Sequence, residues 1–300
     1  MTITFYDIPS TTPECAWSPN TWKIRSISPE NYRDSNHDTN PGISRFNFRY
    51  ALNYRNIPYK TEWIEYPDIK EHCIKHGIKP TGKTRFTNGP EVIERDYYSL
   101  PAIYDPKTNT YLADSLRIVE YLEHAYPPSP SSPSLFPNNT HALQVAFTTA
   151  YNVTTRDDGV ADFIVPAVYT KLNVASQPYF RRTREERFGK RLEDVFPKPG
   201  SEEDKAGWSK FKEVTGILDG WYAKTDIFGE DSEGKTVAER RTPFLMGDTL
   251  SWGDLVIAGY TIWLRIIWGE DSDKWQDMMT WHGGRWKTLM ANLKKYETVL

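Results

Sequence analysis

The chain has 300 residues, of which 38% are hydrophobic, and its formal net charge at pH 7 is −3. This length predicts about two domains, and the apolar content is sufficient for real hydrophobic cores. The small net charge gives no reason to expect nucleic acid or an anionic membrane as a partner.

The sequence shows no targeting or membrane-spanning segment. Residues 1–9 lack the basic start and the long apolar run of a signal peptide. No stretch approaches the roughly 20 apolar residues that cross a bilayer. Two cysteines, Cys15 and Cys73, are too few for a disulfide framework and are typical of a reducing compartment. We therefore expect a soluble, cytoplasmic protein.

The first part of the chain alternates strand-like and helical patterns. Residues 3–8 and 59–66 alternate as strands do, while residues 100–104 and 110–112 flank a turn-rich loop and predict a hairpin. Pro101 should not lie in a central strand unless its peptide bond is cis and turned outward. The order strand, helix, strand, then strand, strand, helix resembles the thioredoxin-like fold, with a mixed sheet.

The first helix is predicted to begin at Ser18, directly after the first strand. Ser followed by Pro is a common N-cap pairing, which by itself indicates only a folding signal. Thioredoxin-like proteins carry a cysteine at this junction, where the helix dipole and free N–H groups stabilise a thiolate. A hydroxyl there can instead donate a hydrogen bond to a bound thiolate and lower that thiol's pKa. Ser18 is our candidate catalytic residue, with Asn20 in support.

A polar segment, residues 26–49, separates this helix start from a second helical pattern at residues 50–55. The segment is rich in Ser, Asn, Asp and Pro and lacks helical periodicity, so it predicts a loop or disorder. Two interpretations stay open. The segment is a lid-like loop near the active site, or it is a translated intron that the mature protein lacks. We favour the intron, because excision restores one continuous amphipathic helix.

Asp114 and Ser115 directly precede an amphipathic run at residues 116–126. A carboxylate and a hydroxyl at a helix start cap its unpaired N–H groups and can also face a ligand. The next stretch, residues 127–137, is rich in Pro and Ser and predicts a solvated linker. We therefore divide the chain into an N-terminal domain of residues 1–126 and a C-terminal domain of residues 138–300.

The second half has almost no strand signal, and we expect helices at residues 142–151, 205–221 and 251–268. Ser251 and Asp254 form a capping-box pattern, and Leu250 and Leu255 occupy the positions of a hydrophobic staple. Aromatic residues in this half either line an apolar pocket for an aromatic substrate or fill an ordinary core, which we favour for most of them. They are Tyr151, Phe163, Tyr169, Trp221, Trp263 and Trp268.

Three other features are weaker candidates. Cys15 lies three residues before Ser18, a spacing that read alone is a monothiol redox pattern, although the position of Pro19 argues against that register. His72 and His76 could share a helix face, but no third ligand accompanies them, so we expect no metal site. Residues 181–187 form a mixed charge run that is typical of a solvated helix face.

Leu100-Pro101, Asp114-Ser115 and the Ser18 junction together resemble the glutathione-binding half of a glutathione S-transferase. Residues 244–256 resemble the capping motif of that family's C-terminal domain. The resemblance implies an α/β thioredoxin-like domain followed by an all-α helical domain. It also implies that Leu100, next to the cis Pro101, pairs its backbone with the cysteine of glutathione. The acid–serine pair would hold the γ-glutamyl end.

Four stretches more narrowly resemble fungal transferases of the etherase-like class, which are similar to bacterial enzymes that cleave β-aryl ethers. They are residues 17–23, 50–54, 57–63 and 179–186. The resemblance implies a homodimer in which glutathione attacks a hydrophobic or aromatic electrophile, with glutathione as cosubstrate. Two alternatives stay open: a non-catalytic protein that sequesters hydrophobic molecules in the same cleft, and a thiol transferase that depends on Cys15.

Overall fold

The computed structural model describes residues 2–19, 49–88, 91–156, 158–227, 233–236 and 239–299. Asn20 and residues 26–48 of the predicted insertion lie outside these ranges. Arg49, which we assigned to the insertion, is instead the first residue of helix α2 (Arg49–Tyr54) and is fully buried. Helix α2 therefore begins one residue before the helical pattern that the sequence predicted at residues 50–55.

The N-terminal half is built on a four-stranded mixed sheet with the strand order β2-β1-β5-β6. Strand β1 (Ile3–Asp7) is parallel to β2 (Tyr59–Trp63) and antiparallel to β5 (Ala102–Asp105), which forms a hairpin with β6 (Thr110–Ala113). All residues of β1 are buried, as expected for a central strand. The predicted strands and hairpin are present, although β2 ends at Trp63, three residues before the predicted end, and Tyr66 begins a 3-10 turn.

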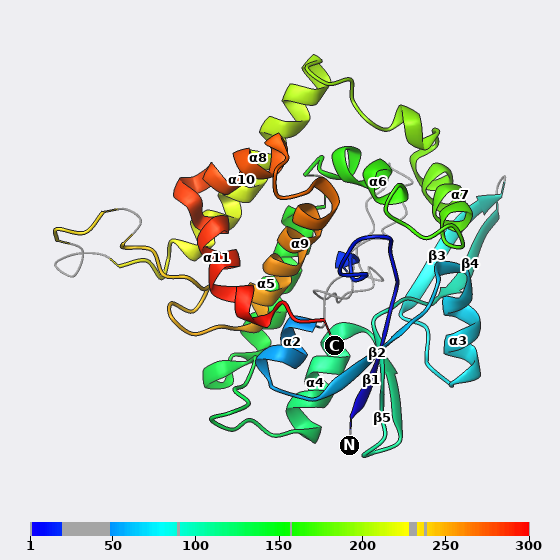
Figure 1. The fold of residues 1–300 in the computed structure, drawn as a ribbon, viewed down its shortest axis with the longest axis horizontal. Helices are drawn as coiled ribbons and strands as arrows, with labels where there is room; N and C mark the ends of the chain where they lie inside the picture. The colour runs from blue at the N-terminus through cyan, green and yellow to red at the C-terminus, as the bar shows by residue number, and fades with distance from the viewer. Residues whose placement is uncertain are drawn as a thin grey trace.

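Helices cover both faces of this sheet (Figure 1). Phe5 and Tyr6 point to opposite faces, because successive side chains of a strand alternate. Arg49 of α2 lies over the Phe5 ring, and α4 (Ser115–Ala125) contacts β5 and β6. Helix α3 (Ile69–Lys75) covers the other face, where its His72 contacts the Tyr6 ring at a centroid distance of 4.4 Å. The result is the layered arrangement of a thioredoxin-like domain.

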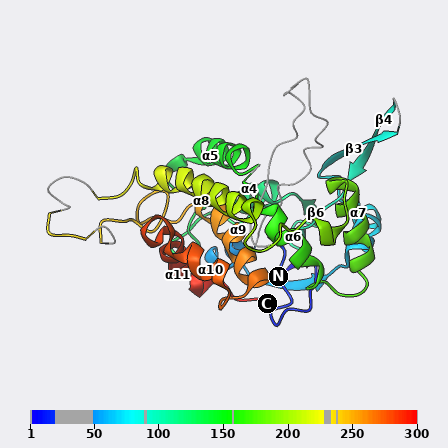
Figure 2. The ribbon, with the colours of Figure 1, turned by 90° about the horizontal axis from the view of Figure 1, so that it is seen from above.

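A second hairpin, β3 (Gly82–Asn88) and β4 (Glu91–Tyr97), was not predicted from the sequence. It forms its own two-stranded sheet and projects from the body of the protein (Figure 2).

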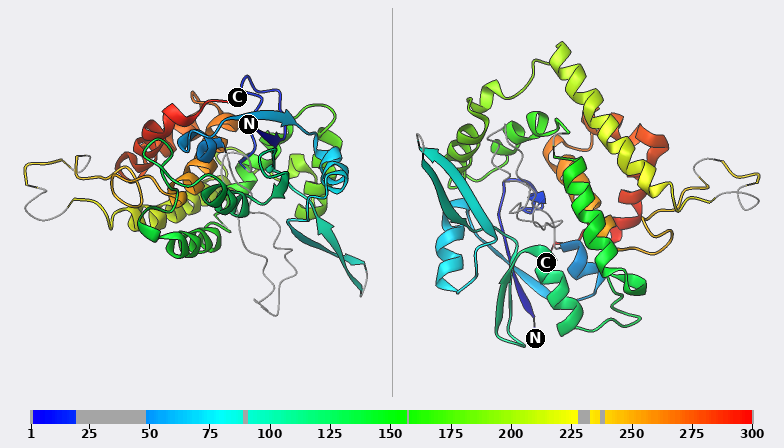
Figure 3. Two further views of the ribbon diagram at one scale, coloured as in Figure 1. Left: turned by 90° about the horizontal axis from the view of Figure 1, so that it is seen from below. Right: turned by 180° about the vertical axis from the view of Figure 1, so that it is seen from behind.

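The second half is helical, as predicted (Figures 1 and 3). Its helices are α5 (His141–Thr154), α6 (Ala161–Tyr169), α7 (Gln177–Phe188), α8 (Glu202–Tyr222), α9 (Trp252–Trp268), α10 (Asp273–Thr280) and α11 (Arg285–Leu293). Helix α9 is mostly buried and contacts α5, α6, α10 and α11, so it is the centre of this half. No helix among the described residues is long and apolar enough to cross a membrane.

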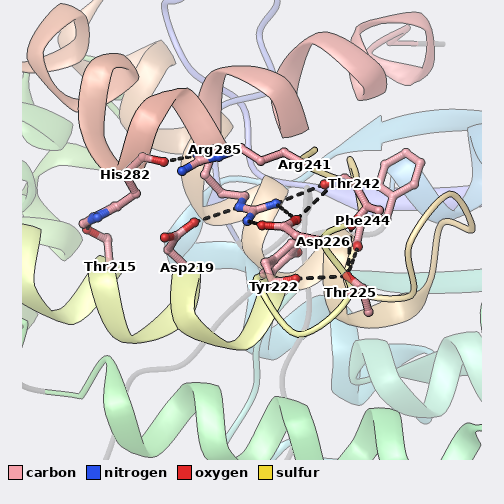
Figure 4. A network of polar contacts seen from close by, with 10 residues as sticks. All are labelled: Thr215, Asp219, Tyr222, Thr225, Asp226, Arg241, Thr242, Phe244, His282 and Arg285. Atoms are coloured by element: carbon pink, nitrogen blue, oxygen red, sulfur yellow. Dashed lines mark hydrogen bonds and ion pairs between the residues drawn. The ribbon is translucent and has the colours of Figure 1, made fainter. Parts of the chain in front are cut away.

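A buried polar network fixes the end of α8 to α11 (Figure 4). The guanidinium of Arg285, only 1% exposed, pairs with Asp219 at 2.7 Å and with Asp226 at 2.5 Å. Arg241 donates a hydrogen bond to the carbonyl of His282, and Arg285 donates to that of Thr242. Two carboxylates compensate one buried guanidinium, which is the arrangement that burial of a charge requires.

The C-terminal tail returns to the N-terminal half and packs against α2. Glu297 accepts hydrogen bonds from Arg265 of α9 at 2.7 Å and from Tyr50 at 3.1 Å. The side-chain amide of Asn53 donates to the carbonyls of Tyr296 and Thr298. These contacts tie the first and last parts of the chain together.

The capping box at the start of α9 is formed as predicted. The Asp254 carboxylate accepts hydrogen bonds from the backbone N–H and hydroxyl of Ser251, and two more come from Tyr222 and the N–H of Leu245. The side chain is completely buried, and this burial raises its pKa to about 6 against the opposing effect of the hydrogen bonds.

This shift makes the stability of the fold depend on pH. Because the folded state holds the Asp254 proton more tightly than the unfolded chain does, the stability due to this residue falls as pH rises from about 4 to 6. We expect the difference in unfolding free energy between the wild type and Asp254→Asn to decrease by about 2–3 kcal/mol across this range. Urea unfolding at several pH values measures it, with the exposed Asp273→Asn as control. A difference that grows with pH would contradict this.

Candidate functional site

Three predicted site elements meet at one edge of the sheet. Tyr6 lies opposite Ala102, so Leu100 and Pro101 are beside the C-terminal end of β1. Ala102 in turn lies opposite Ala113, which brings Asp114 to the same edge. The register of the strands therefore gathers residues that are more than a dozen positions apart in the sequence.

The segment after β1 folds back to this edge as well. The Ser10 hydroxyl donates to the carbonyl of Cys15 at 2.8 Å. The ring centroid of Trp17 lies 6.4 Å from that of Tyr66, which follows the end of β2. Because β2 is parallel to β1 and ends beside Asp7, Trp17 and the adjoining Ser18 lie near the same edge. Ser18 is completely buried and directly precedes a helical residue.

The Leu100–Pro101 peptide bond is cis, as predicted for a proline at the start of this strand. Both residues are buried. The bond lies just before β5, so Pro101 does not interrupt the hydrogen-bond ladder of a central strand.

Asp114 is the N-cap of α4 and accepts a hydrogen bond from the N–H of Arg117 at 3.2 Å. Its φ of +76° is unusual for a residue other than glycine. Such strained backbone clusters at functional sites, where it is one form of pre-organisation. Ser115 follows as the first residue of α4 and is buried. The predicted capping role of Asp114 is confirmed.

A buried ion pair between Asp7 and Arg49 lies at the end of β1, next to this edge of the sheet. Both side chains are 0% exposed, and Arg49 Nη2 lies 2.6 Å from Asp7 Oδ2. Asp7 Oδ1 also accepts from the N–H of Ile8 at 2.6 Å, and Arg49 donates to the hydroxyl of Thr61 at 3.0 Å. The pair therefore joins β1, β2 and α2 where the chain turns toward Ser18.

The helical half contacts this edge at two places. The N–H of Thr11 donates to the carbonyl of Lys171 at 2.8 Å. The carboxylate of Glu65, just before Tyr66, accepts from Asn173 at 2.8 Å and from Ser176 at 2.5 Å. The predicted site therefore lies at the junction of the two halves.

The aromatic residues near Trp17 differ from those that the sequence analysis singled out. Tyr66 stacks on Tyr179 at 5.7 Å and lies 6.0 Å from Phe180 of α7. Both α7 residues belong to the stretch 179–186, which is the signal that could have identified them. Several of the singled-out residues instead pack against aromatic neighbours within the helical half, including Phe163, Trp221, Trp263 and Trp268.

The weaker candidates gain no support from their surroundings. Burial raises the pKa of the Cys15 thiol, which disfavours a thiolate nucleophile there. The rings of His72 and His76 are 4.6 Å apart, and burial lowers the pKa of His72. Among the described residues, no group of three or more His, Cys, Asp or Glu side chains could hold a metal ion.

Comparisons with known proteins identify the class that this fold and site define. The family model for the glutathione S-transferase C-terminal domain matches residues 142–296, and that for the N-terminal domain matches residues 48–125. The chain therefore belongs to the glutathione S-transferase family and is an enzyme of that class.

Individual relatives agree with this assignment. A glutathione S-transferase of Ceriporiopsis subvermispora, solved in complex with glutathione, is 36% identical, with a TM-score of 0.77 and coverage of 100% of this chain and 99% of that chain. A glutathione transferase of Phanerochaete chrysosporium is 34% identical, with a TM-score of 0.75 and full coverage of both chains. The glutathione S-transferase-like protein ustS of Aspergillus flavus is 27% identical over 95% of this chain and 87% of that protein.

The buried ion pair should be essential to the stability of this edge. Arg49→Met removes the guanidinium that pairs with the buried Asp7 carboxylate, and loss of one partner of a buried ion pair typically costs about 3–5 kcal/mol of unfolding free energy. Arg49→Lys keeps the charge but not the two-nitrogen contact, so we expect an intermediate loss. Urea unfolding measures both. Lys60→Met, which breaks an exposed pair with Glu62, is the control. Equal stability of Arg49→Met and the control would contradict this role.

Proposed function

We propose that this enzyme activates the thiol of glutathione with Ser18 and transfers it to a hydrophobic or aromatic electrophile. The observation that carries the proposal is that the cis Leu100–Pro101 bond and the α4 start lie at one sheet edge, with Trp17, the neighbour of Ser18, near the same edge. A relative of 36% identity that was solved with glutathione bound supports glutathione as the cosubstrate.

The residues at this edge have the chemistry that glutathione needs. The extended peptide backbone of glutathione can pair with the backbone of Leu100. The Asp114 carboxylate suits the ammonium group of the γ-glutamyl end. The hydroxyl of Ser115 and the N-terminus of α4 suit the carboxylate of that end, because helix N-termini favour anions.

Ser18 would act on the sulfur. A hydroxyl that donates a hydrogen bond to a thiolate favours the ionised form, and a low local dielectric strengthens that bond. The thiolate then attacks an electrophilic carbon, a new C–S bond forms, and the leaving group departs with the bonding electron pair. In a β-aryl ether the leaving group is the aryloxide, which takes up a proton. We propose such ether cleavage as one reaction of this site.

We further propose that the protein consists of the domains 1–126 and 138–300, joined by the linker 127–137, and that it forms a homodimer. The two family models match residues on either side of this linker, which supports the division.

Replacing Ser18 by Ala tests the thiol activation. We expect kcat/KM for a neutral electrophile such as 1-chloro-2,4-dinitrobenzene to fall about tenfold or more, since a hydrogen bond to a charged group is lost. The acidic limb of the pH–rate profile should move to higher pH, because the bound thiol's pKa rises. Cys15→Ser is the control and should change neither. Loss of activity in Cys15→Ser, with Ser18→Ala unaffected, would establish the thiol transferase instead.

Replacing Asp114 by Asn separates its two roles. Asparagine is also a good N-cap and tolerates positive φ, so we expect α4 and the fold to keep their stability. The negative charge is lost, so KM for glutathione should rise about tenfold while KM for the electrophile stays constant. Steady-state kinetics and thermal unfolding check the two expectations. An unchanged KM for glutathione would show that Asp114 does not hold the ammonium group.

A further inference from the structure

Helix α7 carries four arginines in two different settings. Arg181 and Arg182 each pair with the glutamate one turn further along the helix, at 2.8 Å and 3.4 Å. Arg184 and Arg187 have no carboxylate within ion-pair distance in the part of the chain that the structure describes. Within the mixed charge run of residues 181–187, only Arg181 and Arg182 are therefore paired with glutamates of the same helix.

Arg184 is on the side of α7 that meets the N-terminal half, and Arg187 follows three positions later on the same helix. The guanidinium of Arg184 lies 4.4 Å from the Phe180 ring and 5.7 Å from the Tyr66 ring. Tyr66 is in turn the neighbour of Trp17, which adjoins Ser18. Helix α7 packs on the turn that begins at Tyr66, at the junction of the two halves (Figure 1). Two aromatic contacts thus connect Arg184 to the proposed thiol site.

Among the described residues, no carboxylate pairs with either of these two arginines. Arg187 is accessible to solvent, yet partial desolvation and the positive charge of Arg184 lower its pKa to about 10. Arg184 donates one hydrogen bond, to the Thr183 hydroxyl at 2.8 Å. Two guanidinium groups that repel each other without an intervening acid would both be stabilised by an anion between them.

We propose that Arg184 and Arg187 bind the carboxylate of an acidic aromatic cosubstrate, whose reactive carbon faces the Ser18 segment. Guanidinium groups match the planar geometry of a carboxylate with paired N–H donors. The aromatic rings of Tyr66 and Phe180 lie beside Arg184, which suits an aromatic acid. This inference rests on the proposed function, in which the helical half holds the second substrate and Asp114 holds the γ-glutamyl end of glutathione.

Equilibrium binding tests the inference without turnover. Calorimetric titration of the full chain with 3,5-dinitrobenzoate and with its uncharged amide, each in the presence and absence of glutathione, compares probes that differ in the charged group. We expect the benzoate to bind more tightly than the amide. Arg187→Gln and Arg184→Gln should each weaken benzoate binding about tenfold, since each removes hydrogen bonds to a charged group, and leave amide binding unchanged.

Arg182→Gln is the matched control, because it removes the same charge from the same helix at an arginine that already has a partner. It should leave both dissociation constants unchanged. Equal loss of benzoate binding in Arg182→Gln and Arg187→Gln would indicate a diffuse charge effect and overturn the site. Equal affinity of the wild type for benzoate and amide would also overturn it. A weakening of glutathione binding in Arg187→Gln would assign the pair to glutathione's own carboxylate and overturn the inference as stated.

Stability distinguishes a binding role from a structural one. Removal of one of two like charges should leave the urea midpoint of Arg187→Gln unchanged or slightly higher, whereas a lower midpoint would mark a structural role and count against the site. Conjugation of glutathione to 1-chloro-2,4-dinitrobenzene by the wild type is a separate test of the proposed function. Absence of that reaction would defeat the transferase proposal, while the benzoate titration would still report on the arginine pair.

Discussion

The buried ion pair between Asp7 and Arg49 is the contact on which the rest of the proposed site depends. Asp7 is the last residue of β1, where the chain leaves the sheet toward Ser18, and Arg49 is the first residue of α2. A buried carboxylate must be compensated by a partner, so the end of the strand and the start of the helix cannot separate without a large cost. The backbone that leads to Ser18 therefore starts from a fixed point.

The proposed site also depends on contacts between the two halves of the protein. Glu65 holds Asn173 and Ser176 beside the end of β2, and Glu297 joins α9 to Tyr50 of α2. The first contact lies next to Tyr66, and the second ties the C-terminal tail to the N-terminal half. A shift of the helical half would consequently move α7 and its arginines relative to the sheet edge. The position of the second substrate relative to glutathione therefore depends on how the two halves pack against each other.

Features that depend on neighbouring residues were predicted from the sequence. Features that depend on residues far apart in the chain, such as the pairing of Arg49, were missed. The cis bond before Pro101, the Asp114 cap and the Ser251 capping box each depend on a few neighbouring residues, so the sequence alone revealed them. Arg49 was assigned to a loop because its partner, Asp7, lies 42 positions away. The difference between Arg182 and Arg187 could have been read from the spacing, because Glu186 follows Arg182 by four positions whereas Arg191 follows Arg187. The β3–β4 hairpin was not predicted, although polar and apolar residues also alternate in places between Gly82 and Tyr97.

The position of Arg49 has a consequence for the gene that encodes this chain. An arginine also stands at position 25, so removal of residues 25–48 and removal of residues 26–49 produce the same protein sequence. Either product has a guanidinium directly before Tyr50. The residue type that neutralises Asp7 is therefore encoded at both borders of the segment. Long and short translation products would both carry it, and a matched one-codon shift of both splice boundaries, from 26–49 to 25–48, would leave the counter-charge in place.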